Sequence, residues 1–127
     1  MIINNNKLRN SEKNWLYYLL NSRDYDYKKE IIKQLENADI EREFNKYYLF
    51  VKFILNENFE QIYNYRIFPI EMRIFRYKKS PMQILLHLKE KKIYLLEVFN
   101  ADLSEVDINY IITNKDKIEI VFSGEER

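Results

Sequence analysis

The stretch Met82–Asp102, MQILLHLKEKKIYLLEVFNAD, decides the fold that the sequence predicts. Apolar residues alternate with other residues on both sides of a charged segment at 90–92. A period of two is typical of strands, so we expect an antiparallel pair of strands joined by a tight turn. Each strand has one face of alternate residues: Ile84, Leu86 and Leu88 in the first, and Tyr94, Leu96 and Val98 in the second.

Two amphipathic helices are predicted nearer the N-terminus. The first begins near Ser11, which we expect to cap the free N–H groups, and Glu12 is favourable in a first turn. Its apolar stripe consists of Trp15, Leu16, Leu19 and Leu20. A polar connector at 21–26 leads to a second helix over 27–37, where apolar residues recur every four positions.

Extended segments fill the rest of the chain. At 40–44 charged residues alternate with apolar ones and with Arg42, which predicts an exposed or edge strand. After a turn at 45–46, the segment 47–55 is apolar on both faces and predicts a strand inside the sheet. Pro69 predicts an edge, a bulge or a break in the segment 63–77. A short helical turn at 102–107 and a last strand near 118–122 complete the prediction.

Helices followed by strands favour an α+β fold. We expect two N-terminal helices packed on a mainly antiparallel sheet of five or six strands. At 127 residues the chain is predicted to form a single domain, 1–127, with flexible ends at 1–10 and 123–127. The sequence contains no Cys and no apolar run of the ~20 residues that span a bilayer, so we expect a cytoplasmic protein with no membrane partner.

No motif predicts catalysis. A nucleophile triad needs a His base, and the one His of the chain, His87, lies in a predicted strand, where we expect a structural or surface role. One Gly is too few for a phosphate-binding loop. We therefore expect a protein that is not an enzyme and has no catalytic, cofactor-binding or metal-binding residues.

Two carboxylates, Glu97 and Asp102, are candidates for acid–base chemistry because they lie close in sequence. For Glu97 we favour a structural role, an ion pair with a basic residue of a neighbouring strand. The candidate partners are Arg73, Arg76 and Lys89.

Protein binding is the function that the composition favours. Tyrosine occurs 11 times, and Tyr and Arg are enriched in the residues that dominate binding energy at interfaces. The predicted partner-binding residues are Asp24, Tyr25, Asp26, Glu41, Glu43, Tyr63, Tyr65, Arg73 and Tyr77.

The alternative is a nucleic-acid-binding or regulatory module that uses the basic and aromatic region 65–79. This region contains Arg66, Arg73, Arg76, Lys78 and Lys79. A net charge of +1 gives no overall bias toward nucleic acid, so we do not expect it as the main partner.

Two stretches carry a resemblance to known proteins: LRNSEKNWLYYLL at 8–20, and Ile84-x-Leu86-x-Leu88 followed by IYLLEVFNAD at 93–102. Their order is similar to that in an uncharacterised bacterial family of small α+β proteins, although the Gly-rich turn of that pattern is replaced here by Asn45–Lys46. In type, the chain also resembles immunity proteins of bacterial toxin–immunity pairs, including contact-dependent growth inhibition systems. That resemblance implies binding to a cognate protein toxin domain and its neutralisation.

Overall fold

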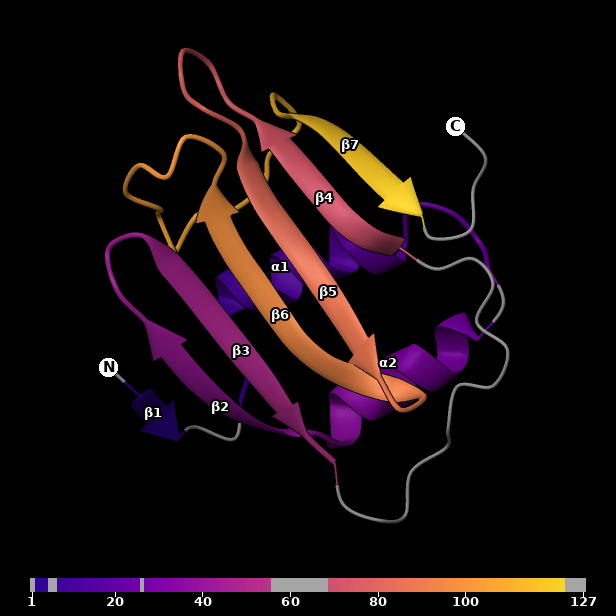
Figure 1. The fold of residues 1–127 in the computed structure, drawn as a ribbon. Coiled ribbons are helices and arrows are strands. Elements are labelled where there is room, and N and C mark those ends of the chain that lie inside the picture. The colour runs from indigo at the N-terminus through magenta and orange to yellow at the C-terminus, as the bar shows by residue number, and fades with distance from the viewer. Residues whose placement is uncertain (1, 5–6, 26, 56–68, 123–127) are drawn as a thin grey trace.

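The computed structural model describes residues 2–4, 7–25, 27–55 and 69–122. These form two helices and one antiparallel sheet of seven strands in the order β1-β2-β3-β6-β5-β4-β7 (Figure 1). The elements are β1 (Ile2–Asn4), α1 (Asn10–Leu20), α2 (Lys28–Asn37), β2 (Asp39–Phe44), β3 (Tyr48–Ile54), β4 (Pro69–Phe75), β5 (Met82–Lys89), β6 (Lys92–Asn100) and β7 (Lys117–Phe122).

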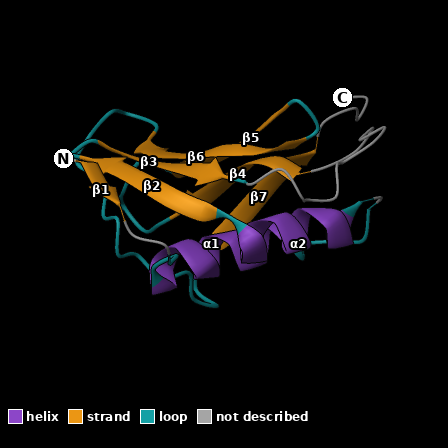
Figure 2. Ribbon diagram, turned by 90° about the horizontal axis from the view of Figure 1, so that it is seen from below, coloured by secondary structure: helices purple, strands orange, loops and turns teal. Residues whose placement is uncertain are grey.

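Both helices lie on the same face of the sheet (Figure 2). The core fills the space between these two layers, and Trp15, Leu19 and Ile31 from the helices are inaccessible to solvent in it. The predicted α+β class, with two N-terminal helices packed on an antiparallel sheet, is confirmed. The three-residue strand β1, which the sequence analysis did not predict, lies at one edge.

Strands β5 and β6 form the predicted hairpin. Its two-residue turn consists of Glu90 and Lys91, both with positive φ (53° and 64°), as in the turns that match the twist of paired strands. Strand β3 lies between β2 and β6, as its two apolar faces predicted. At Pro69 the structure has both a strand start and a register shift against β7.

Strand β6 carries a bulge that changes its predicted faces. Leu95 pairs with His87, but the next pair is Ile93 with Leu88, so Tyr94 is an extra residue. Ile93 therefore points into the core with Leu96, and the predicted alternation beginning at Tyr94 is wrong at this end of the strand.

The bulge is supported from α2. The buried backbone N–H of Ile93 donates a 2.8 Å hydrogen bond to Oε1 of Gln34, whose side chain is also buried. A buried N–H without an acceptor is costly, so this amide side chain replaces the strand partner that the bulge removes.

The prediction that Ser11 caps α1 is wrong. The helix begins one residue earlier, and the Ser11 hydroxyl donates to the carbonyl of Ile108, at 2.7 Å. The N–H of Arg9 instead donates to Oε1 of Glu12, at 2.7 Å. Ser11 is thus a link between the helix and a distant segment of chain.

That segment is the connection from β6 to β7, residues 101–116, which leads from β6 to the far edge of the sheet past β5 and β4. The indole N–H of Trp15 donates to the carbonyl of Tyr110, and the N–H of Ile112 donates to Oδ1 of Asn14, both at 2.8 Å. The helical turn predicted at 102–107 is absent from this described segment, where the Asn100 side-chain amide donates instead to the carbonyl of Glu105.

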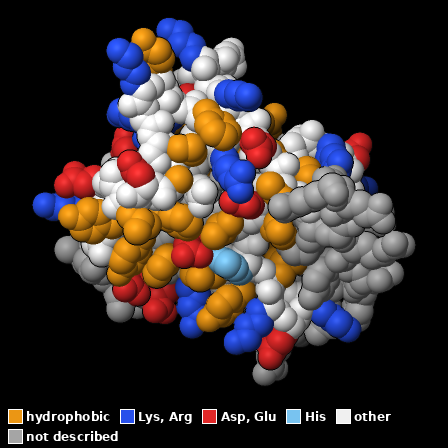
Figure 3. Space-filling model, turned by 45° about the horizontal axis from the view of Figure 1, so that its top comes forward, with side chains coloured by type: hydrophobic (Ala, Val, Ile, Leu, Met, Phe, Trp, Pro, Cys, Tyr) orange, Lys and Arg blue, Asp and Glu red, His pale blue; other side chains and the backbone are white. Residues whose placement is uncertain are grey.

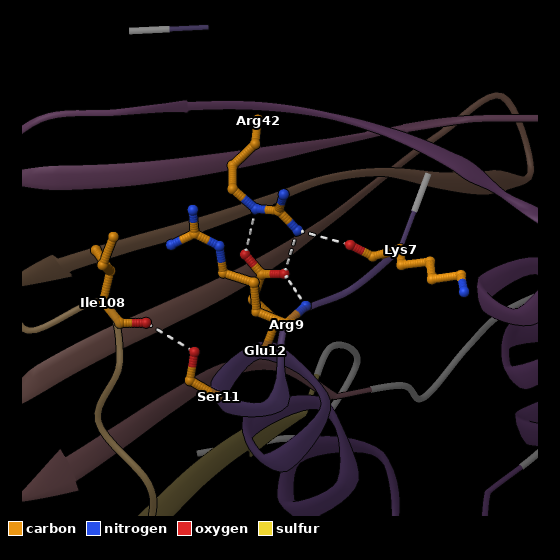
Figure 4. Close-up of polar contacts among 6 residues, drawn as sticks. All are labelled: Lys7, Arg9, Ser11, Glu12, Arg42 and Ile108. Carbon is orange, nitrogen blue, oxygen red and sulfur yellow. Dashed lines mark hydrogen bonds and ion pairs between the residues drawn. The ribbon is translucent and has the colours of Figure 1, made fainter. Parts of the chain in front are cut away.

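The prediction that the segment 40–44 forms an exposed or edge strand is wrong. Strand β1 pairs with the free edge of β2, so β2 is not an edge strand. Ile40 and Arg42 of β2 are buried. Arg42 in β2 is fully buried and lies over Glu12 (Figure 4). Its Nε and Nη2 donate to the two carboxylate oxygens at 2.6 and 2.5 Å, and Nη2 also donates to the carbonyl of Lys7. Alternation placed Arg42 on the same face as Ile40, and that face proves to be the core.

Candidate protein-interaction face

The sheet surface opposite the helices, called the outer face below, is the candidate site. No helix among the described residues covers it (Figure 2). It combines partly exposed apolar side chains with charged ones, which are interspersed in Figure 3. The apolar members are Tyr48, Phe50, Phe75, Leu85, Tyr94, Leu95, Phe99 and Val121; the charged members are Glu41, Glu43, Lys52, Glu71, Arg73, His87, Lys89, Glu97, Lys117 and Glu119.

Strand pairing aligns six of these residues in one line across the sheet, called the central row below. From β2 to β7 the row reads Glu43, Phe50, Glu97, Leu85, Glu71 and Val121. Acidic and apolar residues alternate without interruption, although neighbours in the row come from different strands. The pattern is invisible in the sequence because it depends on the strand order.

Each charge of the row has a local polar partner. The hydroxyl of Tyr48 donates to Glu43 at 2.9 Å, and this hydrogen bond, followed by desolvation, raises the pKa of the Tyr48 hydroxyl. Arg73 bridges Glu71 and Glu119 at 3.3 and 3.2 Å.

Glu97 also pairs with a neighbouring strand, but its partner is His87, at 3.0 Å, and none of the three basic residues that were predicted. Arg73 lies two strands away from Glu97 and is bound to other carboxylates. His87 is on the exposed surface of β5, with a side chain that is 43% exposed, in agreement with the surface role expected for it.

Aromatic rings lie beside the row. The rings of Tyr48 and Phe50 stack with centroids 4.5 Å apart. The Tyr94 ring has Lys52 and Lys89 nearby, with their ammonium groups 5.9 and 5.0 Å from its centroid. Aromatic side chains that are partly exposed and already ordered lose little entropy when a partner covers them.

Three of the predicted partner-binding residues lie on the outer face: Glu41 and Glu43 in β2, and Arg73 four strands away in β4. Asp24 and Tyr25 lie elsewhere, in the connection between the helices. Tyr77 projects from the β4–β5 turn and is 86% exposed. The remaining predicted residues, Asp26, Tyr63 and Tyr65, lie outside the described residues.

Tyr25 is held in place by the fold. Its ring packs edge-on against Phe122 with centroids 6.1 Å apart, and burial raises the pKa of its hydroxyl. Asp24 forms an ion pair with Lys28, at 3.6 Å.

The predicted basic region is divided between different surroundings. Arg73 is on the outer face, while Arg76 turns to the end of the sheet and donates to Asn100 and to the carbonyl of Ser80. Lys78 and Lys79 are exposed and line a groove of about 500 Å³, together with Asp102, Glu105 and Asp107. Arg66 lies outside the described residues.

The structure does not bring Glu97 and Asp102 together. Asp102 lies in the turn after β6, where its carboxylate accepts from the hydroxyl and N–H of Ser104. These hydrogen bonds lower the pKa of the Asp102 carboxyl, so its shift arises mainly within this turn. Among the described residues, no three His, Asp or Glu side chains are grouped as metal ligands would be.

The outer-face residues Phe50, Leu85, Phe99 and Val121 were not among the predicted binding residues. For Phe50 a signal existed, since alternation places Tyr48, Phe50, Lys52 and Ile54 on one face of β3. Which face the helices cover could not be derived from that alternation.

Comparison of the chain with family models, with curated proteins and with solved structures finds no match. Neither α1 nor α2, the helices of the described chain, is long and apolar enough to cross a membrane.

Proposed function

We propose that this chain is a non-enzymatic protein-binding module that neutralises a cognate protein toxin domain, as an immunity protein does. The observation that supports protein binding is the outer face, a sheet surface rich in partly exposed aromatic and aliphatic side chains with charged groups between them. Aromatic residues and Arg are enriched at protein interfaces, and the outer face presents Tyr48, Phe50, Tyr94, Phe99 and Arg73.

The outer face also suits tight binding in its geometry. The hydrogen bonds between paired strands hold its backbone in place. The contacts of Tyr48, Arg73 and Tyr94 restrain side chains on it. A rigid surface loses less conformational entropy on association than mobile loops do. Neutralisation would follow when the bound chain covers the active site or a partner surface of the toxin.

The test is a rescue experiment. The reading frame next to the gene is expressed in cells with and without this protein. Rescue of growth from a toxic neighbour, together with formation of a complex by the two purified proteins, is the expected result. A toxic neighbour that still kills when both proteins are expressed and folded would contradict the proposal, as would a harmless neighbour.

Substitutions then locate the interface. Phe50→Ala and Leu85→Ala remove outer-face side chains, and Tyr17→Ala is the matched control, because Tyr17 is 64% exposed on α1. Loss of a central apolar anchor costs at least about 1.4 kcal/mol, so we expect at least about tenfold weaker binding from the outer-face variants and an unchanged affinity for the control. Full rescue and full affinity in both outer-face variants would exclude this face as the interface.

A further inference from the structure

We propose that the element of the partner that docks on the outer face is a basic amphipathic helix lying across the strands, along the central row. This inference rests on the proposed function and specifies the chemistry of its partner. The occupant is defined by Lys or Arg side chains one heptad apart, with apolar side chains between them.

Charge and spacing both point to this occupant. The three acids of the row, Glu43, Glu97 and Glu71, come from alternate strands. Neighbouring strands lie ~4.8 Å apart, so successive acids are about 9.6 Å apart along the row. In an α-helix, residues seven positions apart lie on one side at a spacing of about 10.5 Å.

The apolar members of the row match the same helix. Phe50 and Leu85 stand midway between the acids, about 4.8 and 14.4 Å from the start of the row. Helix positions i+3 and i+10 lie about 4.5 and 15 Å from position i, so apolar residues there would meet Phe50 and Leu85 while cations at i, i+7 and i+14 meet the acids.

The width of the apolar surface favours a helix over a single extended chain. Tyr48 and Phe99, which pair with each other, lie two residues along their strands from Phe50 and Glu97, or about 7 Å to the side. A helix is about 10–12 Å wide with its side chains and would cover both the row and this aromatic pair.

The existing ion pairs leave room for cations from a partner. His87 contacts Oε1 of Glu97, and Arg73 contacts Oε1 of Glu71. A carboxylate has a second oxygen and can accept several hydrogen bonds. The side chains of Glu97 and Glu71 are 28% and 18% exposed, so both are accessible and partly desolvated. Partial desolvation strengthens their attraction to a cation.

Two synthetic peptides test the inference on the full chain. The first is an Ala-rich helix of about 20 residues, with Lys at i, i+7 and i+14 and Leu at i+3 and i+10. The second has the same composition with its Lys distributed around the helix. Fluorescence anisotropy of labelled peptide measures binding at low and at physiological salt.

A triple variant, Glu43→Gln with Glu71→Gln and Glu97→Gln, removes the charges of the row without removing side-chain volume. The matched control is Glu36→Gln, Glu105→Gln and Asp39→Asn, three exposed acids outside the row. The loss of three partly exposed ion pairs should weaken binding of the first peptide by about 3- to 100-fold. We expect that loss in the row variant and less than a twofold change in the control.

Equal binding of both peptides would overturn the inference, because only the first has the proposed register. Absence of saturable binding, or binding that the row variant does not weaken, would also overturn it. A third peptide, a polyproline II segment with Lys every three residues, repeats at about 9.3 Å; tighter binding of this peptide would replace the helix with an extended occupant.

These outcomes are separate from those that test the proposed function. If no peptide binds but the outer-face variants lose rescue, the face binds the toxin through another element. If the first peptide binds in register but the neighbour is harmless, the helix site stands and toxin neutralisation falls.

Discussion

Arg42 of β2 and Glu12 of α1 are joined by two hydrogen bonds, and both side chains are completely buried. The same two residues bind the backbone of the chain between β1 and α1, through the carbonyl of Lys7 and the N–H of Arg9. This ion pair therefore links the start of the first helix to the sheet.

Glu12→Gln should lower the free energy of unfolding by about 3–5 kcal/mol, because it leaves the Arg42 charge buried without its counter-ion. The double variant Glu12→Leu with Arg42→Met should lose much less, since it removes both charges together. Urea denaturation measures both, with Glu36→Gln on the exposed side of α2 as control. A Glu12→Gln variant as stable as the control would contradict the role assigned to the pair.

Gln34→Leu should lower the free energy of unfolding by about 1–3 kcal/mol, because the buried N–H of Ile93 then lacks an acceptor. The matched control is Gln83→Leu, the same change on the outer face. Hydrogen exchange gives the local measurement: the Ile93 amide should lose protection in the first variant alone. Unchanged protection would mean that Gln34 does not support the bulge.

Lys91→Gly should raise the free energy of unfolding by about 0.5–1 kcal/mol. The left-handed conformation at Lys91 costs a residue with a Cβ about 1–2 kcal/mol, and the greater freedom of Gly in the unfolded chain offsets part of the gain. Thermal unfolding measures the change. Lys115→Gly, at a turn position where φ is not positive, should give no gain; an equal gain there would show that the turn conformation is not the cause.

Tyr110 should make stability depend on pH in the alkaline range. Burial, followed by the hydrogen bond to Asp116, raises the pKa of its hydroxyl to about 12. The native state then retains a proton that the unfolded chain loses near pH 10, so this contribution is complete below about pH 10 and is lost as the pH rises toward about 12.

Tyr110→Phe lacks this contribution, so its deficit in stability relative to the wild type should shrink as the pH rises through that window. Denaturant midpoints across the range measure the deficit, and Asp116→Asn should give a smaller pH dependence than the wild type. A deficit that stays constant from neutral to strongly alkaline pH would show that Tyr110 does not titrate as described.

Much of the fold could be predicted because alternation and helical periodicity report which residues share a face. The stripe of Trp15 and Leu19 in α1, and the two faces of β3, lie where their periods place them. Periodicity does not report which face is buried. Arg42 was assigned to an exposed strand for that reason, and a buried arginine can be recognised only when its partner, here Glu12 from 30 residues away, is known.

The candidate site was less accessible to prediction than the fold. Glu43, Glu97 and Glu71 belong to one row only because β3 pairs with β6 and β6 with β5, an order that no local pattern contains. Tyr94 shows the same limit within one strand. As the extra residue of a bulge it lies on the face opposite to the one that alternation predicts, and the neighbouring N–H of Ile93 is bound by Gln34 of another element.

The placement of the helices has a consequence for cooperativity. α1 packs on β4 and α2 packs on β6, although the strands that directly follow the helices are β2 and β3. The first part of the chain therefore buries apolar surface against the second, and we expect the two parts to unfold together. The one tryptophan of the chain, Trp15, is fully buried between these parts, and its fluorescence should therefore change in the same single transition as the circular dichroism of the sheet.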